Sequence, residues 1–168
     1  MAALYCNRKD PANKLCSVAY RFPNKNSYDA SGYVWEIVRH PVQGTPIKIK
    51  QYATCETENV IYLLKCPCGK GYVGQTSRSI KTRIKEHRGN IRNYKQGSPT
   101  DTTVSRHFNL ANHNQTQLKW MVLEVIQTPQ RGGDMKQYLS QRETFWIKRL
   151  DTLQPLGMND SCSVKCYL

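Results

Sequence analysis

VIYLLKCPCGKGYVGQT, residues 60–76, decides the fold of this chain. It begins with the apolar run VIYLLK (60–65) and ends with YVGQT (72–76), and both runs are rich in the β-branched and aromatic residues that strands prefer. The stretch between them, CPCGKG (66–71), has the proline and glycine content of a tight turn. The sequence therefore predicts a β-hairpin with a glycine-rich turn.

Three further elements follow the hairpin. Apolar residues recur at helical spacing from Ile80 to about residue 95, which predicts a helix. LKWMVLEVIQ (118–127) is typical of a strand, and MKQYLSQRETFWIKRL (135–150) of a second helix. The order strand, strand, helix, strand, helix predicts a small α+β domain over residues 55–160.

The N-terminal third has a different character. Residues 1–32 are polar and show no sustained period, so we interpret them as an arm. YVWEIVRH (33–40) and PIKIKQY (46–52) predict two short strands around a turn. We expect residues 1–54 to form an arm with a short β-hairpin, and residues 161–168 to form a C-terminal tail.

Charge and cysteine content limit the class of protein. The 168 residues include 25 Lys and Arg against 12 Asp and Glu, a net charge of +13 that favours polyanionic partners. The longest apolar run is far short of a membrane span, and the first residues do not resemble a signal peptide. We therefore expect an intracellular protein with no membrane association. In a reducing compartment, seven cysteines indicate a metal site rather than disulfides.

The helix predicted from Ile80 carries two kinds of basic residue. At about 100° per residue, Arg83 lies beside the apolar stripe, one turn before His87. The other basic residues gather on a separate face, in a segment (60–95) with nine Lys and Arg and one Glu. An ordinary solvated face is the alternative, but this concentration favours a track that binds phosphates. Its members are Lys81, Lys85, Arg88, Arg92 and Lys95.

Glu143 falls inside the apolar stripe of the helix predicted at 135–150. A carboxylate there loses hydration, at a cost that requires a metal or a partner such as Arg83 in a buried ion pair. We expect Arg83, His87 and Glu143 to face the same small core. An acid, a base and a cation at one rim are typical of a phosphodiesterase site.

These residues fall into a known order. The set V-I-Y at 60–62, Y-V-G at 72–74, Arg83 and His87, R-E-T-F-W-I with Glu143, and L-G-M-N ending at Asn159 resembles the GIY-YIG endonuclease family. The resemblance covers roughly residues 60–160, with Val60 at the position of the first glycine. CPCG between the half-motifs, and T-C before the first, make the chain most similar to the C-terminal endonuclease domain of Penelope-like retroelements.

The resemblance implies a small antiparallel three-stranded sheet flanked by helices, and a DNA endonuclease that uses one divalent ion, Mg²⁺ or Mn²⁺. Glu143 would hold the ion, and one of the motif tyrosines Tyr62 and Tyr72 would help activate the attacking water. Arg83 would stabilise the transition state, His87 would assist proton transfer or grip a phosphate, and Asn159 would close the site. We expect single-strand nicking that supports target-primed integration, a nuclear location, and no small-molecule cofactor.

Two physical expectations accompany these roles. A free tyrosine has a pKa near 10 and is a poor base at neutral pH, so we expect Arg83, Lys65, Lys70 and a metal to lower that value. Gly74 would let the backbone pass close to the helix and the substrate, where a side chain would block approach.

Cysteines and histidines indicate a second metal. Similar elements carry two cysteines between the half-motifs and two histidines downstream, which matches Cys66, Cys68, His107 and His113. Zinc takes about four such ligands, and Cys55 is a reserve ligand. The alternative is two exposed hairpin cysteines and two loop histidines.

Two classes of function remain. One is an active nicking endonuclease with a structural zinc. The other is a basic, zinc-stabilised DNA- or RNA-binding module whose nuclease site has decayed. The complete motif set favours the enzyme, because a decayed copy would have lost some of these residues. A disulfide-rich heparin binder is disfavoured by the odd number of cysteines.

Overall fold

A computed structural model describes residues 36–40, 43–44, 46–49, 53–127 and 134–162. The predicted arm at 1–32 and most of the predicted C-terminal tail lie outside the described residues. Within them, none of the helices is both long enough and apolar enough to cross a bilayer.

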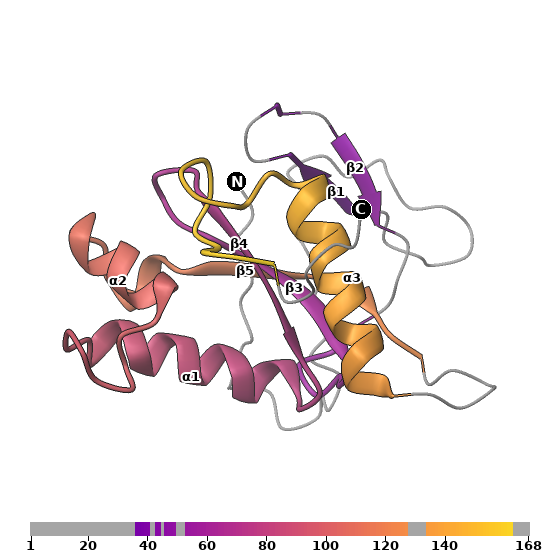
Figure 1. Ribbon diagram of the computed structural model, residues 1–168, viewed down its shortest axis with the longest axis horizontal. Helices are drawn as coiled ribbons and strands as arrows, with labels where there is room; N and C mark the ends of the chain where they lie inside the picture. Colours follow the sequence, from indigo (N-terminus) through magenta and orange to yellow (C-terminus); the bar gives the residue numbers. More distant parts are fainter. Residues whose placement is uncertain (1–35, 41–42, 45, 50–52, 128–133, 163–168) are drawn as a thin grey trace, which may run out of the picture.

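The hairpin that opens the domain is present as predicted (Figure 1). Strands β3 (Val60–Lys65) and β4 (Gly71–Thr76) pair antiparallel, and β5 (Lys119–Val125) pairs antiparallel with the other edge of β3. The strand order is therefore β4-β3-β5, which confirms the three-stranded antiparallel sheet. Gly69 provides the positive φ of +96° at the hairpin turn, a conformation that glycine adopts without strain.

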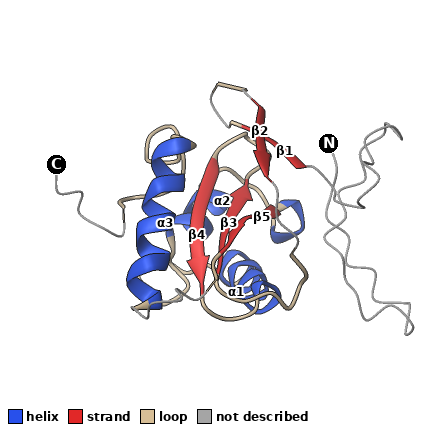
Figure 2. Ribbon diagram, turned by 90° about the vertical axis from the view of Figure 1, so that its right-hand side faces the viewer, coloured by secondary structure: helices blue, strands red, loops and turns tan. Residues whose placement is uncertain are grey.

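Helices cover both faces of this sheet (Figure 2). Helix α3 (Met135–Arg149) packs on the face that presents Ile61 and Leu63, where the core includes Leu139 and Ile147. Helices α1 (Ile80–Arg92) and α2 (Thr103–Leu110) pack on the opposite face, against side chains that include Tyr62. Successive strand residues point to opposite faces, so central strand β3 is buried on both.

Helix α2 is absent from the sequence prediction. It has eight residues and buries Val104, Ser105 and Phe108, so its apolar period is too short to stand out. Its local signal is a cap: the Thr102 side chain accepts from the Ser105 amide, and the Ser105 side chain accepts from the Thr102 amide. A short 3-10 helix (Gln115–Gln117) leads from α2 into β5. Helix α1 ends at Arg92, three residues before the predicted end.

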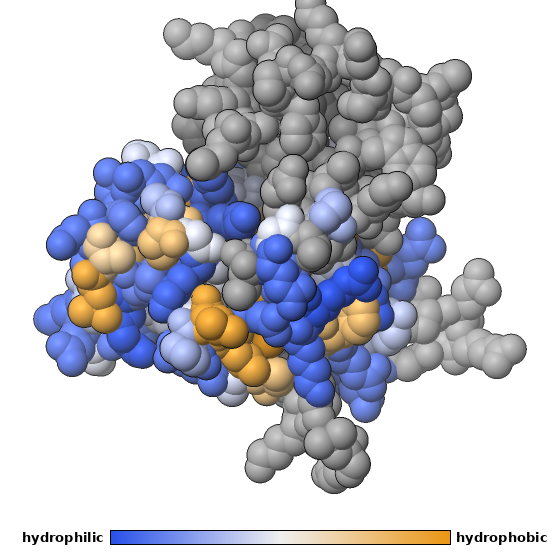
Figure 3. All heavy atoms as spheres, turned by 90° about the horizontal axis from the view of Figure 1, so that it is seen from above, coloured by the Kyte–Doolittle hydropathy of each residue, from blue (hydrophilic) through white to orange (hydrophobic). Residues whose placement is uncertain are grey.

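A separate two-stranded sheet precedes the domain. Strands β1 (Glu36–Arg39) and β2 (Pro46–Ile49) pair antiparallel, within the two segments predicted to be strands. The buried His40 ring anchors the sheet: its Nδ1 accepts from the Gln43 amide, and its Nε2 lies 3.4 Å from Asp151 Oδ2, just after α3. Among the described residues that are visible in Figure 3, hydrophilic side chains predominate, and the apolar side chains form a few small groups.

Candidate functional site

Tyr62 is the centre of a hydrogen-bonded chain on the α1 face of the sheet. Its side chain is fully buried, and its Oη accepts from Arg83 Nε at 3.0 Å and lies 2.9 Å from His87 Nε2. Because Arg83 has only donors, the hydroxyl proton of Tyr62 points to His87. The sequence prediction placed Arg83 and His87 side by side on one helix, and the structure joins them through this tyrosine.

His87 is a neutral imidazole at physiological pH. Burial, with a smaller effect of the nearby Arg83 charge, lowers the pKa of His87 to about 3. Nε2 is then the acceptor for Tyr62, and Nδ1 carries the proton. In the described part of the chain, no group hydrogen-bonds to this buried Nδ1. The rings of Tyr62 and Tyr72 both pack edge-on against His87.

The tyrosines are weaker acids than expected. Burial raises the pKa of Tyr62 and of Tyr72, and the Arg83 charge opposes this shift in both without reversing it. Arg83, Lys65 and Lys70 therefore do not bring these pKa values below that of a free tyrosine, contrary to expectation; that a bound metal would lower them stays a prediction. Packing of the helices against the sheet shields the tyrosine side chains from water, fully for Tyr62 and in part for Tyr72, and this desolvation outweighs the charge of Arg83. The pKa of Lys65 is itself lowered by burial and by Lys119.

Gly74 leaves the space that the rings of Tyr62 and Tyr72 occupy. It pairs with Tyr62 across the hairpin, and a Cβ on it would lie 2.6 Å from Tyr62 Oη and 2.8 Å from Tyr72 Cε1. Both distances are below normal van der Waals contact. The nearest neighbours of Gly74 are therefore the Tyr62 and Tyr72 rings, not the expected helix, and close approach of the substrate at this position stays a prediction.

Glu143 is buried, as its place in the apolar stripe predicts, but it reaches the site from the other face of the sheet. The expectation that Arg83, His87 and Glu143 face one core is wrong, because α1 and α3 cover opposite faces. Helical spacing orients a residue on its own helix and does not say which face of a sheet the helix covers.

Glu143, on one face of the sheet, and the group formed by Tyr62, Arg83 and His87, on the other face, come closest at β4, which is an edge strand. Gln75 of β4 donates from Nε2 to Ser140 Oγ at 3.0 Å and to Glu143 Oε2 at 3.5 Å. The Glu143 charge contributes to the raised pKa of Tyr72, so the carboxylate and the hydroxyl lie close enough to interact. The ion pair of Arg83 is with Glu86, at 3.0 Å.

Asn159 covers the free edge of β4. Its Oδ1 accepts from the Val73 amide at 2.9 Å, and its Nδ2 donates to the Val73 carbonyl at 2.8 Å. The Met158 amide also donates to the Gly71 carbonyl. Asn159 thus replaces a missing neighbouring strand and holds β4, with Tyr72, in place; both ends of its amide are used for this.

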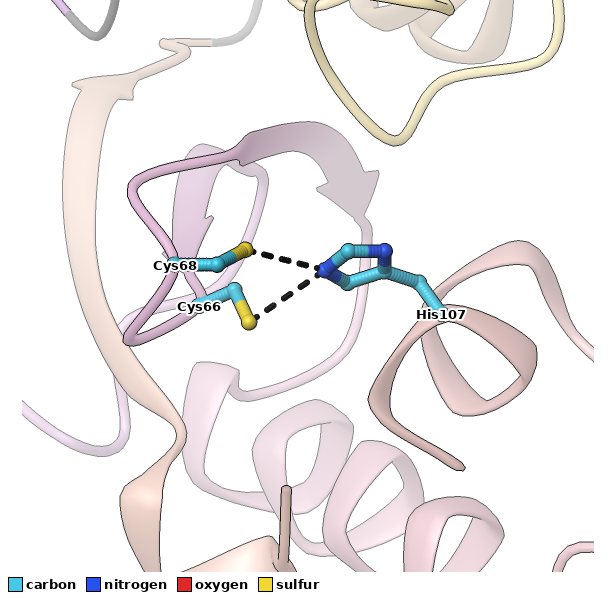
Figure 4. A group of neighbouring side chains, drawn as sticks. All are labelled: Cys66, Cys68 and His107. Atoms are coloured by element: carbon cyan, nitrogen blue, oxygen red, sulfur yellow. Dashed lines mark hydrogen bonds between the residues drawn. The ribbon is translucent and has the colours of Figure 1, made fainter. Parts of the chain in front are cut away.

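Three of the four predicted zinc ligands come together at the hairpin tip (Figure 4). His107 Nε2 of α2 lies 3.3 Å from Cys66 Sγ and 3.2 Å from Cys68 Sγ. The ligand atoms of all three lie within 4.8 Å of one another, and two sulfurs with one imidazole suit zinc. Burial raises the pKa of Cys66 to about 12, so a bound cation would have to displace its proton.

His113 and Cys55 lie outside this cluster. His113 packs on Phe108, with ring centroids 6.2 Å apart, and its charge contributes to the lowered pKa of His107, whose largest cause is burial. Cys55 precedes β3, and its backbone carbonyl accepts from the Lys81 amide at the start of α1, whereas the cluster follows the end of β3. The structure therefore brings together three of the four predicted ligands, and the predicted roles of His113 and of the reserve ligand Cys55 stay predictions.

The predicted phosphate track lies on the outer face of α1 and in the turn after it. All five side chains are exposed, whereas Arg83 is half-buried, as the helical spacing predicts. Lys81 forms an ion pair with Glu56 at 2.9 Å. The members are Lys81, Lys85, Arg88, Arg92 and Lys95.

Two neighbours of the site, Gln75 and Glu86, were not found from the sequence. Glu86 follows Arg83 by three residues, a spacing at which helical side chains of opposite charge meet, and this signal was available. Gln75 carries no comparable signal, since its role depends on α3 packing over β4.

A comparison with known protein families matches residues 58–156 to the GIY-YIG catalytic domain. The matched segment contains the hairpin, helices α1, α2 and α3, and five of the six candidate catalytic residues, with Asn159 just beyond it. No curated protein and no solved structure matches the chain.

Proposed function

The chain belongs to the GIY-YIG catalytic domain family, and from this premise we propose that it is a divalent-metal-dependent DNA endonuclease. Membership implies a nuclease that acts on nucleic acid. The observation that carries the proposal is the hydrogen-bonded series Arg83–Tyr62–His87, with distances of 3.0 and 2.9 Å, and the Glu143 charge that acts on the same tyrosine.

Glu143 would hold the metal ion. A carboxylate is an oxygen ligand of the kind that Mg²⁺ and Mn²⁺ prefer, and burial leaves it little hydration to lose. When bound, the ion would supply charge neutralisation at the phosphoryl oxygens. Gln75 orients this carboxylate from β4.

Tyr72 would contact the attacking water. Tyr62 is fully buried and its hydroxyl is engaged by Arg83 and His87, whereas Tyr72 is only half-buried. We assign Tyr62 and the neutral His87 to orienting Arg83, and Arg83 to stabilising the negative charge that develops on the phosphate. Asn159 keeps β4, and therefore Tyr72, in register.

A structural zinc would join the hairpin tip to α2 through Cys66, Cys68 and His107. The donor set supports this, and His113, whose charge acts on His107, is our candidate for the fourth ligand. The track on α1 would bind the DNA backbone, because its basic side chains are exposed on one face.

We extend the proposal to a retroelement context. The CPCG insertion and its cluster with His107 support a relation to Penelope-like elements, and with it single-strand nicking, target-primed integration and a nuclear location. The other candidate, a decayed zinc-stabilised binding module, shares the basic track but not the cleavage.

Relaxation of supercoiled plasmid separates the two candidates. We expect the protein to convert supercoiled to open-circular DNA with Mg²⁺ or Mn²⁺, and to bind without cutting in EDTA. Binding without cutting in every metal would favour the decayed module.

A further inference from the structure

Glu86 lies between two arginines beside the candidate site. Its Oε2 accepts from Arg83 Nη1 and from Arg78 Nη2, each at 3.0 Å, and its Oε1 lies 2.7 Å from Arg78 Nη1. Arg78 precedes α1 and holds both oxygens of the carboxylate. The contacts therefore form a continuous series from Arg78 through Glu86 and Arg83 to Tyr62 and His87.

Arg83 is fixed at two of its three guanidinium nitrogens. Nε donates to Tyr62 Oη, and Nη1 donates to Glu86. Among the described residues, Nη2 has no hydrogen-bond partner, and 32% of the side chain is exposed. Because a guanidinium is planar and rigid, two fixed nitrogens determine where the third can donate.

We propose that Glu86 is a positioning residue, which holds the Arg83 guanidinium so that Nη2 donates to a phosphate oxygen of the substrate. This inference rests on the proposed function, in which Arg83 is the group that meets the phosphate. Donors that are already oriented before the substrate binds need no reorganisation during the reaction, and this is the source of their effect on rate.

Simple electrostatics predicts the opposite effect of removing Glu86 on cleavage. A carboxylate next to Arg83 reduces the attraction of the guanidinium for a phosphate, and Glu86 is 34% exposed, where ion pairs contribute little to stability. If Glu86 acted only through its charge, its removal would strengthen DNA binding and leave cleavage equal or faster. If Glu86 positions Arg83, its removal slows cleavage.

Two substitutions at this position test the proposal in the full chain. Glu86→Ala removes both the charge and the acceptor, and we expect kcat to fall roughly ten- to a hundredfold with KM within about twofold. Glu86→Gln removes the charge but keeps one acceptor oxygen for Arg83, so it should retain most of the wild-type kcat. Glu56→Ala is the matched control, because it removes a carboxylate from another ion pair of α1, with Lys81, and should keep wild-type kcat.

A second readout is independent of cleavage. The order parameter of the Arg83 Nε–H bond, measured by NMR relaxation, should be high in wild type and Glu86→Gln and lower in Glu86→Ala. Equal order in all three proteins, or a kcat of Glu86→Ala equal to or above wild type, would overturn the proposal. If wild type does not cleave DNA at all, the proposed function fails, while the order of Arg83 still decides whether Glu86 holds it.

Discussion

Arg83 and the exposed basic residues share α1 but have different surroundings. Arg83 donates to buried Tyr62, whereas Lys85 and Arg88 point into solvent. Arg83→Ala should therefore lower the cleavage rate on the order of a hundredfold with little change in DNA affinity. The double variant Lys85→Ala, Arg88→Ala should do the reverse, and flatten the plot of log affinity against log salt by roughly one unit per lost contact. Similar behaviour of the two variants would contradict this division of α1.

Position 74 has no room for a side chain. Its Cβ would meet the Tyr62 ring, so Gly74→Ala should lower the free energy of unfolding by about 1–3 kcal/mol. Gly89, on α1, has no neighbouring atom within 4 Å of its Cβ position and is the matched control. Gly89→Ala should be neutral or stabilising by about 0.5–1 kcal/mol, since alanine favours helix. Urea denaturation measures both, and equal stabilities would show that the Tyr62 ring has room.

Buried His87 gives stability a pH dependence. Its pKa of about 3 in the folded chain lies below the usual value near 6.5, so the unfolded chain binds more protons between these limits. The stability that the neutral ring contributes is complete above about pH 6.5 and is lost as the pH falls towards 3. His87→Gln cannot titrate, so over this range wild type should lose more stability than the variant. Parallel pH profiles of the urea midpoint would show that His87 is protonated as readily in the folded chain as in the unfolded one.

At the scale of elements, a metal would tie the hairpin tip of β3 and β4 to α2. We expect the purified protein to contain about one equivalent of zinc and to lose thermal stability in chelator, because structural zinc contributes folding free energy directly. Cys68→Ser should release the metal and lower activity without touching the substrate. Cys162→Ser, at a half-buried cysteine outside the cluster, is the control and should keep it. A zinc-free wild type that is folded and active would leave the cluster without a metal.

The elements show where sequence reasoning succeeds. Strands β3 and β4 are apolar runs and helices α1 and α3 carry an apolar period, so their type and approximate bounds were predictable. Helix α2 was not, because two buried apolar side chains and a Thr102–Ser105 cap give a weak signal.

The site was predictable in composition but not in arrangement. The spacing of Arg83 and His87 on one helix predicted their proximity, and the stripe on α3 predicted a buried Glu143. That Glu143 comes from the opposite face, and that Tyr62 lies between Arg83 and His87, depend on how helices pack on the sheet. The direction of the tyrosine pKa shift depends on the same packing, since it follows from burial.

The protein combines a large net positive charge with a small α+β domain. The net charge of +13 and the exposed face of α1 favour binding to a polyanion, while the candidate catalytic groups lie around the edge strand β4. DNA that contacts the track on α1 would approach Arg83, which lies on the same helix, so binding and cleavage would draw on neighbouring faces of one element.

The rate of plasmid nicking by Glu143→Ala in Mg²⁺ tests the central claim most directly. Loss of the residue that we propose as the metal ligand should lower the rate on the order of a thousandfold, while DNA affinity and the urea midpoint stay near wild type. Glu58→Ala, which removes an exposed carboxylate just before β3, is the control for the change in charge and should nick at the wild-type rate. Nicking by Glu143→Ala at the wild-type rate would contradict the assignment of a metal-dependent endonuclease site to this carboxylate.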